Sequence, residues 1–200
     1  YTNTPTVAAW FLTHDHGDHS HMLTFDYDRI KAAGIKVENI YASAISKAEL
    51  DDSGVSGGRY VNLFDKLPNA FGANMHRVHP GQVITYANCE IDILYTLEAW
   101  VDGDPAITPQ AGGYNHSSVI FKTTVTDSAS KKTMSVFNTG DGSGQAMQLA
   151  MQIFGEEEIK SDIAVATHHG SGSGDDSMIV KTVKAMAPQI VLFPRGATGL

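Results

Sequence analysis

The sequence has 200 residues, enough for one substantial domain with its own hydrophobic core. Its formal net charge is −8 and no apolar run approaches membrane-spanning length, which argues against a membrane protein and against a general nucleic-acid-binding protein. The single cysteine, Cys89, excludes an intrachain disulfide and leaves the redox compartment open.

The chain begins at Tyr1 rather than at Met, and it stops shortly after its last predicted strand. We therefore interpret it as a fragment of a longer protein. Ordinary apolar content predicts one soluble globular domain over residues 1–200, and no signal peptide is visible in this fragment. Localisation and oligomeric state stay open.

The first predicted element is a buried strand over residues 7–12, an apolar run without helical periodicity. It leads directly into residues 13–20, which read THDHGDHS. This segment holds four metal-binding side chains in an H-x-H-x-D-H pattern: His14, His16, Asp18 and His19. Such groups are costly to desolvate unless they are hydrogen-bonded, paired or bound to metal. Imidazole with carboxylate suits zinc and, less exclusively, iron or manganese.

The spacing of the motif predicts two adjacent metal positions. If the chain stays extended, His14 and His16 point the same way, because strand side chains alternate. Gly17 then frees the backbone to turn, and Asp18 and His19 can reach a second position close by. Two metals about 3.5–4 Å apart are a recurrent hydrolytic device. The alternative is an exposed polar loop that happens to be rich in His and Asp.

The remaining elements follow in chain order. Periodicity and turn signals predict helices over residues 22–33, 60–72, 145–154 and 178–187. They predict further strands over residues 37–41, 75–78, 82–86, 90–97, 118–126, 133–138, 163–166 and 190–194. Residues 51–58 and 102–113 are rich in Gly and Asp and are interpreted as substrate loops without a readable specificity code.

Two further motifs follow predicted strands. Asp141 lies between glycines after the strand at 133–138; an isolated GDG is usually a turn, but a metal cluster that needs a bridging carboxylate makes Asp141 a candidate ligand. His168 and His169 follow the strand at 163–166. One of them can bind metal while the other donates to a developing oxyanion, and a polar turn is the alternative.

Residues 114–118, YNHSS, precede another predicted strand. Asn115 and Ser118 are candidates for supporting the site or for turn formation. His116 could complete a ligand set, with a surface position as an equal alternative.

In chain order the motifs are THDHGDHS, NHSS, NTGDG and ATHHGSGS. This set resembles the metallo-β-lactamase-fold hydrolases, in particular the branch with the hydrolase domain of the competence DNA-uptake channel and the phosphorylcholine esterase. The resemblance covers residues 7–193. It implies an α+β fold, a four-layer αββα sandwich with the metals at one edge of its two sheets. The β-hairpin that the family carries before Val7 is missing, so we expect N-terminal truncation, with C-terminal truncation as an open alternative.

The resemblance also implies roles for individual residues. By the family's pattern, the ligands of two divalent ions would be His14, His16, Asp18, His19, Asp141 and His168. In this pattern Asp141 bridges the ions and His168 completes the second site. Asp18 would orient the nucleophile, and His169 would stabilise charge on a substrate oxygen. Support or substrate contacts would come from Asn115, His116, Ser118 and Ser171.

The implied function is hydrolysis by a metal-bridging hydroxide, because a bound metal can lower the pKa of water from 15.7 to about 7. Zinc is the implied metal, with manganese and iron as alternatives. A phosphoester, foremost a phosphodiester, is the implied small-molecule substrate.

Three alternatives stay open. A metal-dependent nuclease is disfavoured by the acidic balance and by the lack of a basic or aromatic groove. A di-iron redox enzyme would usually need a flavin partner, and no such module is present in this sequence. The third alternative is a non-catalytic metal-binding or cell-wall interaction module.

Overall fold

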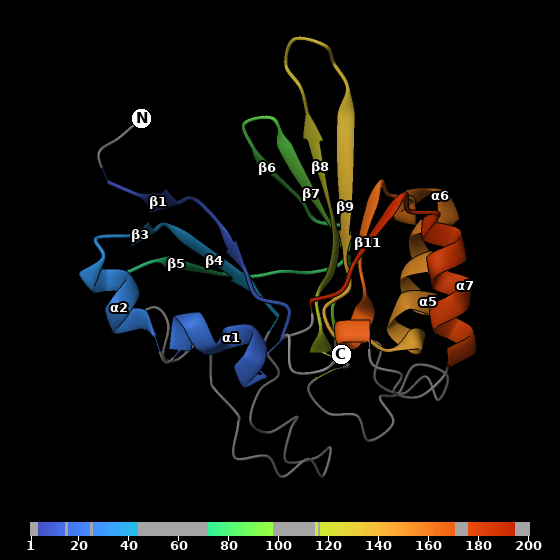
Figure 1. The fold of residues 1–200 in the computed structure, drawn as a ribbon, viewed down its shortest axis with the longest axis horizontal. Helices are drawn as coiled ribbons and strands as arrows, with labels where there is room; N and C mark the ends of the chain where they lie inside the picture. The colour runs from blue at the N-terminus through green and yellow to red at the C-terminus, as the bar shows by residue number, and fades with distance from the viewer. Residues whose placement is uncertain are drawn as a thin grey trace.

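The computed structural model describes residues 4–14, 16–24, 26–43, 72–97, 115, 117–170 and 176–194. In this part of the chain two sheets lie face to face, and helices cover their outer sides (Figure 1). The large sheet has the strand order β11-β10-β9-β8-β7-β6, and the small sheet has the order β2-β4-β5 with the pair β1-β3 beside it.

The small sheet is parallel. Its strands are β2 (Trp10–Phe11), β4 (Asn39–Ala42) and β5 (Asn74–Arg77), and the parallel pair beside it is β1 (Thr6–Val7) with β3 (Lys36–Val37). The strand predicted over residues 7–12 is thus broken into β1 and β2. At the break the side chain of Asn39 donates to the carbonyl of Ala8 at 2.9 Å, where a continuous strand would have used a backbone N–H.

Two helices cover this sheet, α1 (Gly17–Thr24) and α2 (Tyr27–Ala32). The prediction of one helix over residues 22–33 was wrong at its start, because the first helix begins inside the histidine motif. The carbonyl of His16 accepts from the backbone N–H groups of His19 and Ser20, at 3.0 Å each. Asp18 in the first turn suits the positive end of the helix dipole.

The large sheet is antiparallel from β6 to β9, whereas β10 and β11 run parallel to β9. Its strands are β6 (Val83–Tyr86), β7 (Cys89–Tyr95), β8 (Ile120–Thr126), β9 (Thr133–Asn138), β10 (Ile163–Val165) and β11 (Ile190–Leu192). These strands lie close to the predicted ranges, because alternating apolar residues and clear turn residues marked them.

The helices on the outer side of the large sheet are α5 (Gly144–Phe154), α6 (Glu156–Ile159) and α7 (Asp176–Met186). The Ser143 hydroxyl caps α5 by accepting from the N–H of Ala146 at 3.2 Å. The sequence patterns did not predict α6. Its residues, EEEI, carry no helical period, and only Ile159 is buried.

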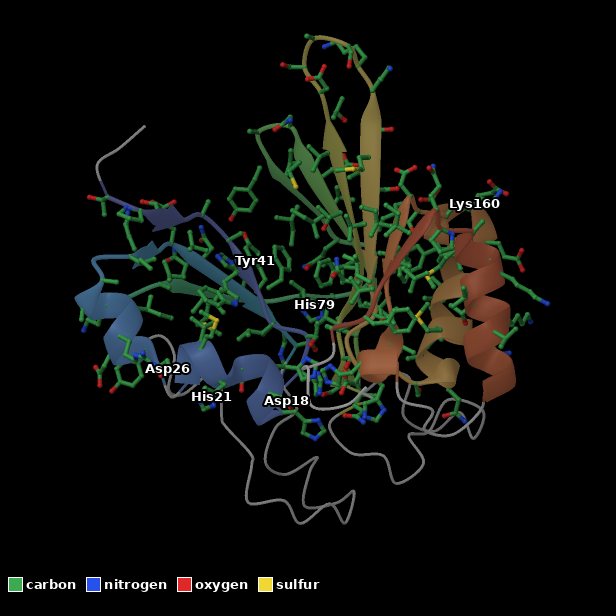
Figure 2. The ribbon with its side chains drawn as sticks, in the orientation of Figure 1. Asp18, His21, Asp26, Tyr41, His79 and Lys160 are labelled. Atoms are coloured by element: carbon green, nitrogen blue, oxygen red, sulfur yellow. The ribbon has the colours of Figure 1, made fainter. Side chains whose placement is uncertain are left out.

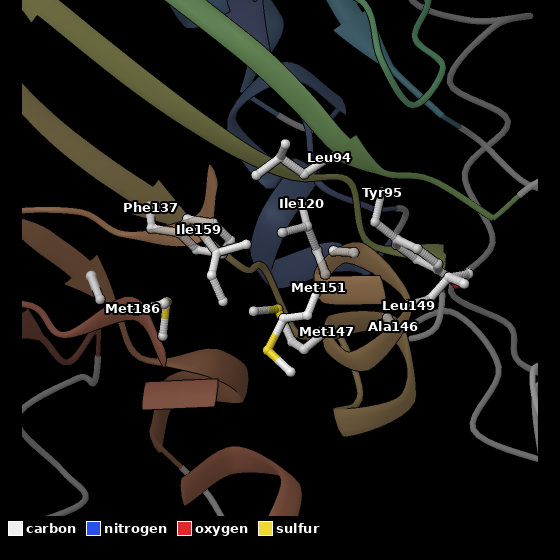
Figure 3. Packing of buried hydrophobic residues seen from close by; sticks show 12 residues of the cluster. Leu94, Tyr95, Ile120, Phe137, Ala146, Met147, Leu149, Met151, Ile159 and Met186 are labelled. Carbon is white, nitrogen blue, oxygen red and sulfur yellow. The ribbon is translucent and has the colours of Figure 1, made fainter. Parts of the chain in front are cut away.

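Three hydrophobic clusters separate the layers. Leu23, Ile30 and Ile40 belong to the cluster between the first helices and the small sheet. Phe121 on the large sheet packs against the ring of Phe11 between the two sheets, with ring centroids 5.3 Å apart. The third cluster fills the space between the large sheet and the helices after β9 (Figure 3).

Neighbouring residues of one strand enter different clusters. Ile120 packs toward α5 while Phe121 packs toward the small sheet, because side chains alternate along a strand. The large sheet is therefore buried on both faces. The layer order is helix, sheet, sheet, helix, and the predicted αββα sandwich is confirmed.

The predicted elements at 51–58, 60–72 and 102–113 lie outside the described residues, apart from Gly72. Among the helices of the described ranges, none has the length and apolar character needed to cross a membrane. The strand ends set the position of the candidate site. The carbonyl of Thr13, after β2, accepts from the N–H of Val119, just before β8, at 2.8 Å, so both sheets meet at this edge.

Candidate metal centre

Three loops converge at the edge where the two sheets meet. One is the histidine motif after β2, one follows β9 and carries Asp141, and one is the short turn Thr167–Gly170 after β10. Figure 2 shows Asp18 at the end of α1 that faces the large sheet. The edge combines loops from distant parts of the sequence.

Asp141 lies at the centre of this cluster and is 5% exposed. Its Oδ1 atom lies 3.3 Å from Nε2 of His19 and 3.7 Å from Nε2 of His169. Its Oδ2 atom lies 3.9 Å from Nε2 of His14 and 3.8 Å from Nε2 of His168. Each carboxylate oxygen therefore faces two imidazoles, one from the motif and one from the turn after β10.

Asp18 forms a second cluster beside the first. Its Oδ2 atom lies 3.3 Å from Nε2 of His169 and 3.8 Å from Nε2 of His19, and the two Nε2 atoms lie 3.2 Å apart. Two groups in the described residues could thus hold a metal ion: His14 with His19 and Asp141, and Asp18 with His19 and His169. The groups share His19, so two ions there would be neighbours.

His16 lies next to the first group, with its Nδ1 atom 3.0 Å from Nε2 of His14. The rings of the two residues are 4.7 Å apart. The expected convergence of these two side chains is present, although the short strand β2 ends at Phe11 and the motif itself is not a strand.

The outer nitrogens of the motif histidines contact hydroxyl groups. Nδ1 of His14 lies 3.1 Å from Oγ1 of Thr13 and 3.2 Å from Oγ of Ser118. Nδ1 of His19 lies 3.3 Å from the same Thr13 oxygen. These contacts direct the Nε2 atoms toward Asp141, as outer-shell partners of metal-binding histidines commonly do. Sequence reasoning missed Thr13, whose place directly before the first histidine was the available signal.

Gly140 allows the loop after β9 to approach the motif closely. Its φ is 53°, and a Cβ atom there would lie 2.8 Å from Cβ of Thr13 and 3.0 Å from Oγ of Ser118. The N–H of Asp141 donates to that same Ser118 oxygen at 3.1 Å. Ser118 therefore contacts both His14 and Asp141.

The electrostatics favour the forms of these residues that bind metal. Burial, followed by the charge of His19, lowers the pKa of His14 to about 3, so its imidazole is neutral near neutral pH. For Asp141, burial acts to raise the pKa, but the hydrogen bond from His19 and the imidazole charges outweigh it and the pKa is lowered. The pKa of Asp18 is lowered too, because its own backbone N–H and His19 outweigh the effect of burial.

The donor set itself fits a metal. Ligand atoms of each group lie within 4.8 Å of one another, and they are imidazole nitrogens and carboxylate oxygens. Neutral imidazole and ionised carboxylate are the forms that coordinate, and the combination suits zinc, iron or manganese.

Of the other expected site residues, the structure describes Asn115 but not His116 or Ser171. Asn115 accepts from the N–H of Ser118 through its backbone carbonyl at 3.2 Å. Its Oδ1 atom is buried and has no hydrogen-bond partner among the described residues. His116 and Ser171 lie outside the described residues.

No protein-family model matches the sequence, and a comparison with curated proteins finds no relative. Solved structures do match. A mutant of the CmlA β-hydroxylase is 15% identical over 93% of this chain and 36% of its own, with a TM-score of 0.53. CmlA from Streptomyces venezuelae, described as a diiron β-hydroxylase, is 15% identical over 94% of this chain and 36% of its own, with a TM-score of 0.51.

The metallo-β-lactamase fold protein YhfI from Bacillus subtilis is also similar. It is 13% identical over 96% of this chain and 68% of its own, with a TM-score of 0.45. The likeness to CmlA is one of fold, and this chain spans 36% of the length of the CmlA chains. The fold class is α+β, an αββα sandwich similar to the fold of CmlA, and its His and Asp cluster could bind metal.

Proposed function

We propose that this chain is a dinuclear metal-dependent hydrolase whose substrates are phosphoesters, with phosphodiesters foremost. The observation that carries the proposal is the central position of Asp141. Each of its two carboxylate oxygens faces a different pair of histidines, and this is the arrangement that a carboxylate bridging two ions requires. The preference for phosphoesters rests on the resemblance of the four motifs to the branch that contains the phosphorylcholine esterase and the hydrolase domain of the competence DNA-uptake channel.

The geometry favours a specific distribution of ligands. The inner ion would be held by His14, His16, His168 and Oδ2 of Asp141. The outer ion would be held by Asp18, His19, His169 and Oδ1 of Asp141. This differs from the family's pattern in one respect, since His169 rather than His168 joins Asp18 and His19. His168 would then complete the ligand set of the inner ion, the position for which the sequence offered His116 as a candidate.

Two divalent ions held there would lower the pKa of a water molecule toward about 7 and polarise a phosphoryl oxygen. Side chains of the centre would position the attacking water and hold the ions. The side chain of Asp18 is 60% exposed and its lowered pKa keeps it ionised, so its carboxylate would bind the outer ion and accept a hydrogen bond that orients the attacking water. His14 and Asp141 are buried and hold the inner side of the centre rigid.

The proposal is tested on purified protein by metal analysis combined with hydrolysis assays. The chain should bind two ions, and chelation should abolish hydrolysis of a chromogenic phosphodiester, with recovery on addition of zinc or manganese. A phosphomonoester and a β-lactam complete the panel. Asp18→Ala should lower phosphodiester turnover by about a hundredfold, because the outer ion and the orientation of the attacking water are both affected.

Asp26→Ala is the matched control for this variant. Asp26 also forms a carboxylate–imidazole pair on the same part of the chain, with His21 at 3.6 Å, but it lies outside the centre. Equal activity of Asp18→Ala and the unmodified chain would contradict the proposal.

A di-iron redox enzyme is the second candidate, because the CmlA structure described as a diiron β-hydroxylase shares this fold. Bound iron with visible absorbance, together with oxygen consumption in place of hydrolysis, would favour it. Steep salt dependence of DNA or RNA binding would favour a nuclease. Tight metal binding without turnover of any substrate in the panel would favour a non-catalytic module.

A further inference from the structure

The turn that carries His168 and His169 has an unusual backbone. φ is 48° at His168 and 55° at His169, and Gly170 follows at 75°. Left-handed backbone costs residues that have a Cβ atom about 1–3 kcal/mol each, so contacts from elsewhere must hold this turn. Sequence reasoning did not identify those contacts.

The contacts come from two neighbouring segments. In the loop after β9 the carbonyl of Gly140 accepts from the N–H of His168 at 3.1 Å, and further contacts come from the residues at and just after the end of β11. The N–H of Ala166 donates to the carbonyl of Leu192 at 2.7 Å, which aligns the start of the turn with that strand. Nδ1 of His169 lies 3.0 Å from the carbonyl oxygen of Pro194. Gly170 lies against the ring of Phe193 so closely that a Cβ atom would be 2.6 Å from Cδ1 of the ring.

The Pro194 contact determines the tautomer of His169. A carbonyl oxygen only accepts hydrogen bonds, so Nδ1 of His169 must carry the proton. In the neutral ring Nε2 then bears a lone pair, and this atom lies 3.3 Å from Oδ2 of Asp18 and 3.2 Å from Nε2 of His19. Proline ends the strand because it has no N–H for the ladder, and its carbonyl is available to the imidazole.

Phe193 is not part of the hydrophobic core. Its side chain is 64% exposed, and it borders an apolar cavity of about 380 Å³ that Met147 and Met186 also line. A ring this exposed adds little to core burial. Its close approach to Gly170 is the contact through which it can affect the turn.

We propose that residues 193–194 are a positioning element for His169. The Pro194 carbonyl keeps the imidazole in the tautomer that presents Nε2 as a ligand, and the Phe193 ring keeps the turn at Gly170 in place. The inference rests on the proposed function, because it takes His169 as a ligand of the outer ion. Neither residue touches the reacting atoms, so both act through His169.

The test uses Phe193→Ala and Pro194→Gly, each compared with the unmodified chain. Ile190→Ala is the matched control, since Ile190 is an apolar residue of the same strand that is 53% exposed. One readout is the tautomer of His169 by nitrogen NMR in metal-free protein. The other is zinc affinity at each site by competition titration, with cobalt absorption spectra as a check on the ligand sphere.

The unmodified chain should show His169 with the proton on Nδ1. In both variants the outer zinc affinity should fall by up to about tenfold, less than when an outer-shell partner is deleted, while the inner affinity is unchanged. Pro194→Gly keeps the carbonyl but frees the backbone that aims it, and Phe193→Ala removes the ring that holds the turn at Gly170. His169 should then sample both tautomers. Ile190→Ala should behave like the unmodified chain.

Two outcomes separate the positioning element from the proposed function. If the chain binds two ions but neither variant alters the tautomer or the outer affinity, the positioning element is refuted and the proposed function stands. If the unmodified chain binds no ion, the proposed function fails. The tautomer measurement in metal-free protein still decides whether residues 193–194 orient His169.

A second pair of variants covers the case in which Phe193→Ala does not fold. Gly170→Ala should displace the ring and weaken the outer site. Gly81→Ala adds the same kind of backbone strain, with φ at 84° and no atom within 4 Å of the added Cβ, and should leave metal binding unchanged. Equal metal affinities for these two variants would overturn the inference.

Discussion

The inner and outer sides of the candidate centre differ in burial. On the inner side, His14 and Asp141 are 1% and 5% exposed. On the outer side, the side chains of Asp18 and His169 are 60% and 29% exposed. Water therefore reaches Asp18 more freely than His14 or Asp141, and on the inner side it reaches the side chain of His168, which is 28% exposed.

The two sides also differ in how their histidines are supported. His14 has two hydroxyl contacts at Nδ1 and lies under the closely packed Gly140 loop. His169 has a single carbonyl contact and a left-handed backbone. Rigid support lowers the cost of ordering a site when it binds, so the inner ion should bind more tightly than the outer one.

The largest effect should come from Asp141→Ala, which removes the carboxylate common to both sides. Both ions should be lost, and phosphodiester hydrolysis should fall on the order of a thousandfold. Metal content after desalting and turnover measure this. Asp28→Ala removes an exposed carboxylate from α2 and should change neither. An Asp141→Ala protein that keeps two ions would show that the two sides are independent.

The difference between the inner and outer sides can be tested by comparing the variants His14→Ala and His169→Ala. His14→Ala should remove the inner ion and destabilise the metal-free fold by about 2–4 kcal/mol, because it leaves a cavity and removes one of the two partners of the buried Ser118 hydroxyl. His169→Ala should remove only the outer ion, with a change in unfolding free energy below about 1 kcal/mol. Urea unfolding and zinc titration give both quantities. Equal losses in the two variants would contradict the difference between the sides.

A smaller effect is expected from Gly140→Ala, with Gly34→Ala as its control. Both glycines have positive φ, 53° and 71°, but only at Gly140 does an added Cβ meet other atoms. Gly34→Ala should cost about 1 kcal/mol through backbone strain alone. Gly140→Ala should cost about 1–3 kcal/mol more, since Thr13 and Ser118 must shift, and should weaken the inner zinc site. If the two variants lose the same stability, close packing at Gly140 is not what holds the inner side.

The sequence was sufficient for the parts of the fold that local patterns encode. Alternation with turn residues marked β6 to β9, and the apolar period with the Ser143 cap marked α5. Local patterns did not predict α6, because only one of its four residues, Ile159, is buried. They also did not predict the break within residues 7–12, where the side chain of Asn39 from β4 takes the carbonyl of Ala8.

For the candidate site, local patterns in the chain supplied the residue types and their places after strands. They made His14, His19, Asp141 and His169 candidate metal ligands, with polar turns as the alternative. Which atoms face one another depends on the tertiary structure. The two oxygens of Asp141, the separate partners of His168 and His169, and the supporting contacts of Thr13 and Pro194 depend on distances between loops. Those distances follow from the stacking of the two sheets, which no local pattern in the chain records.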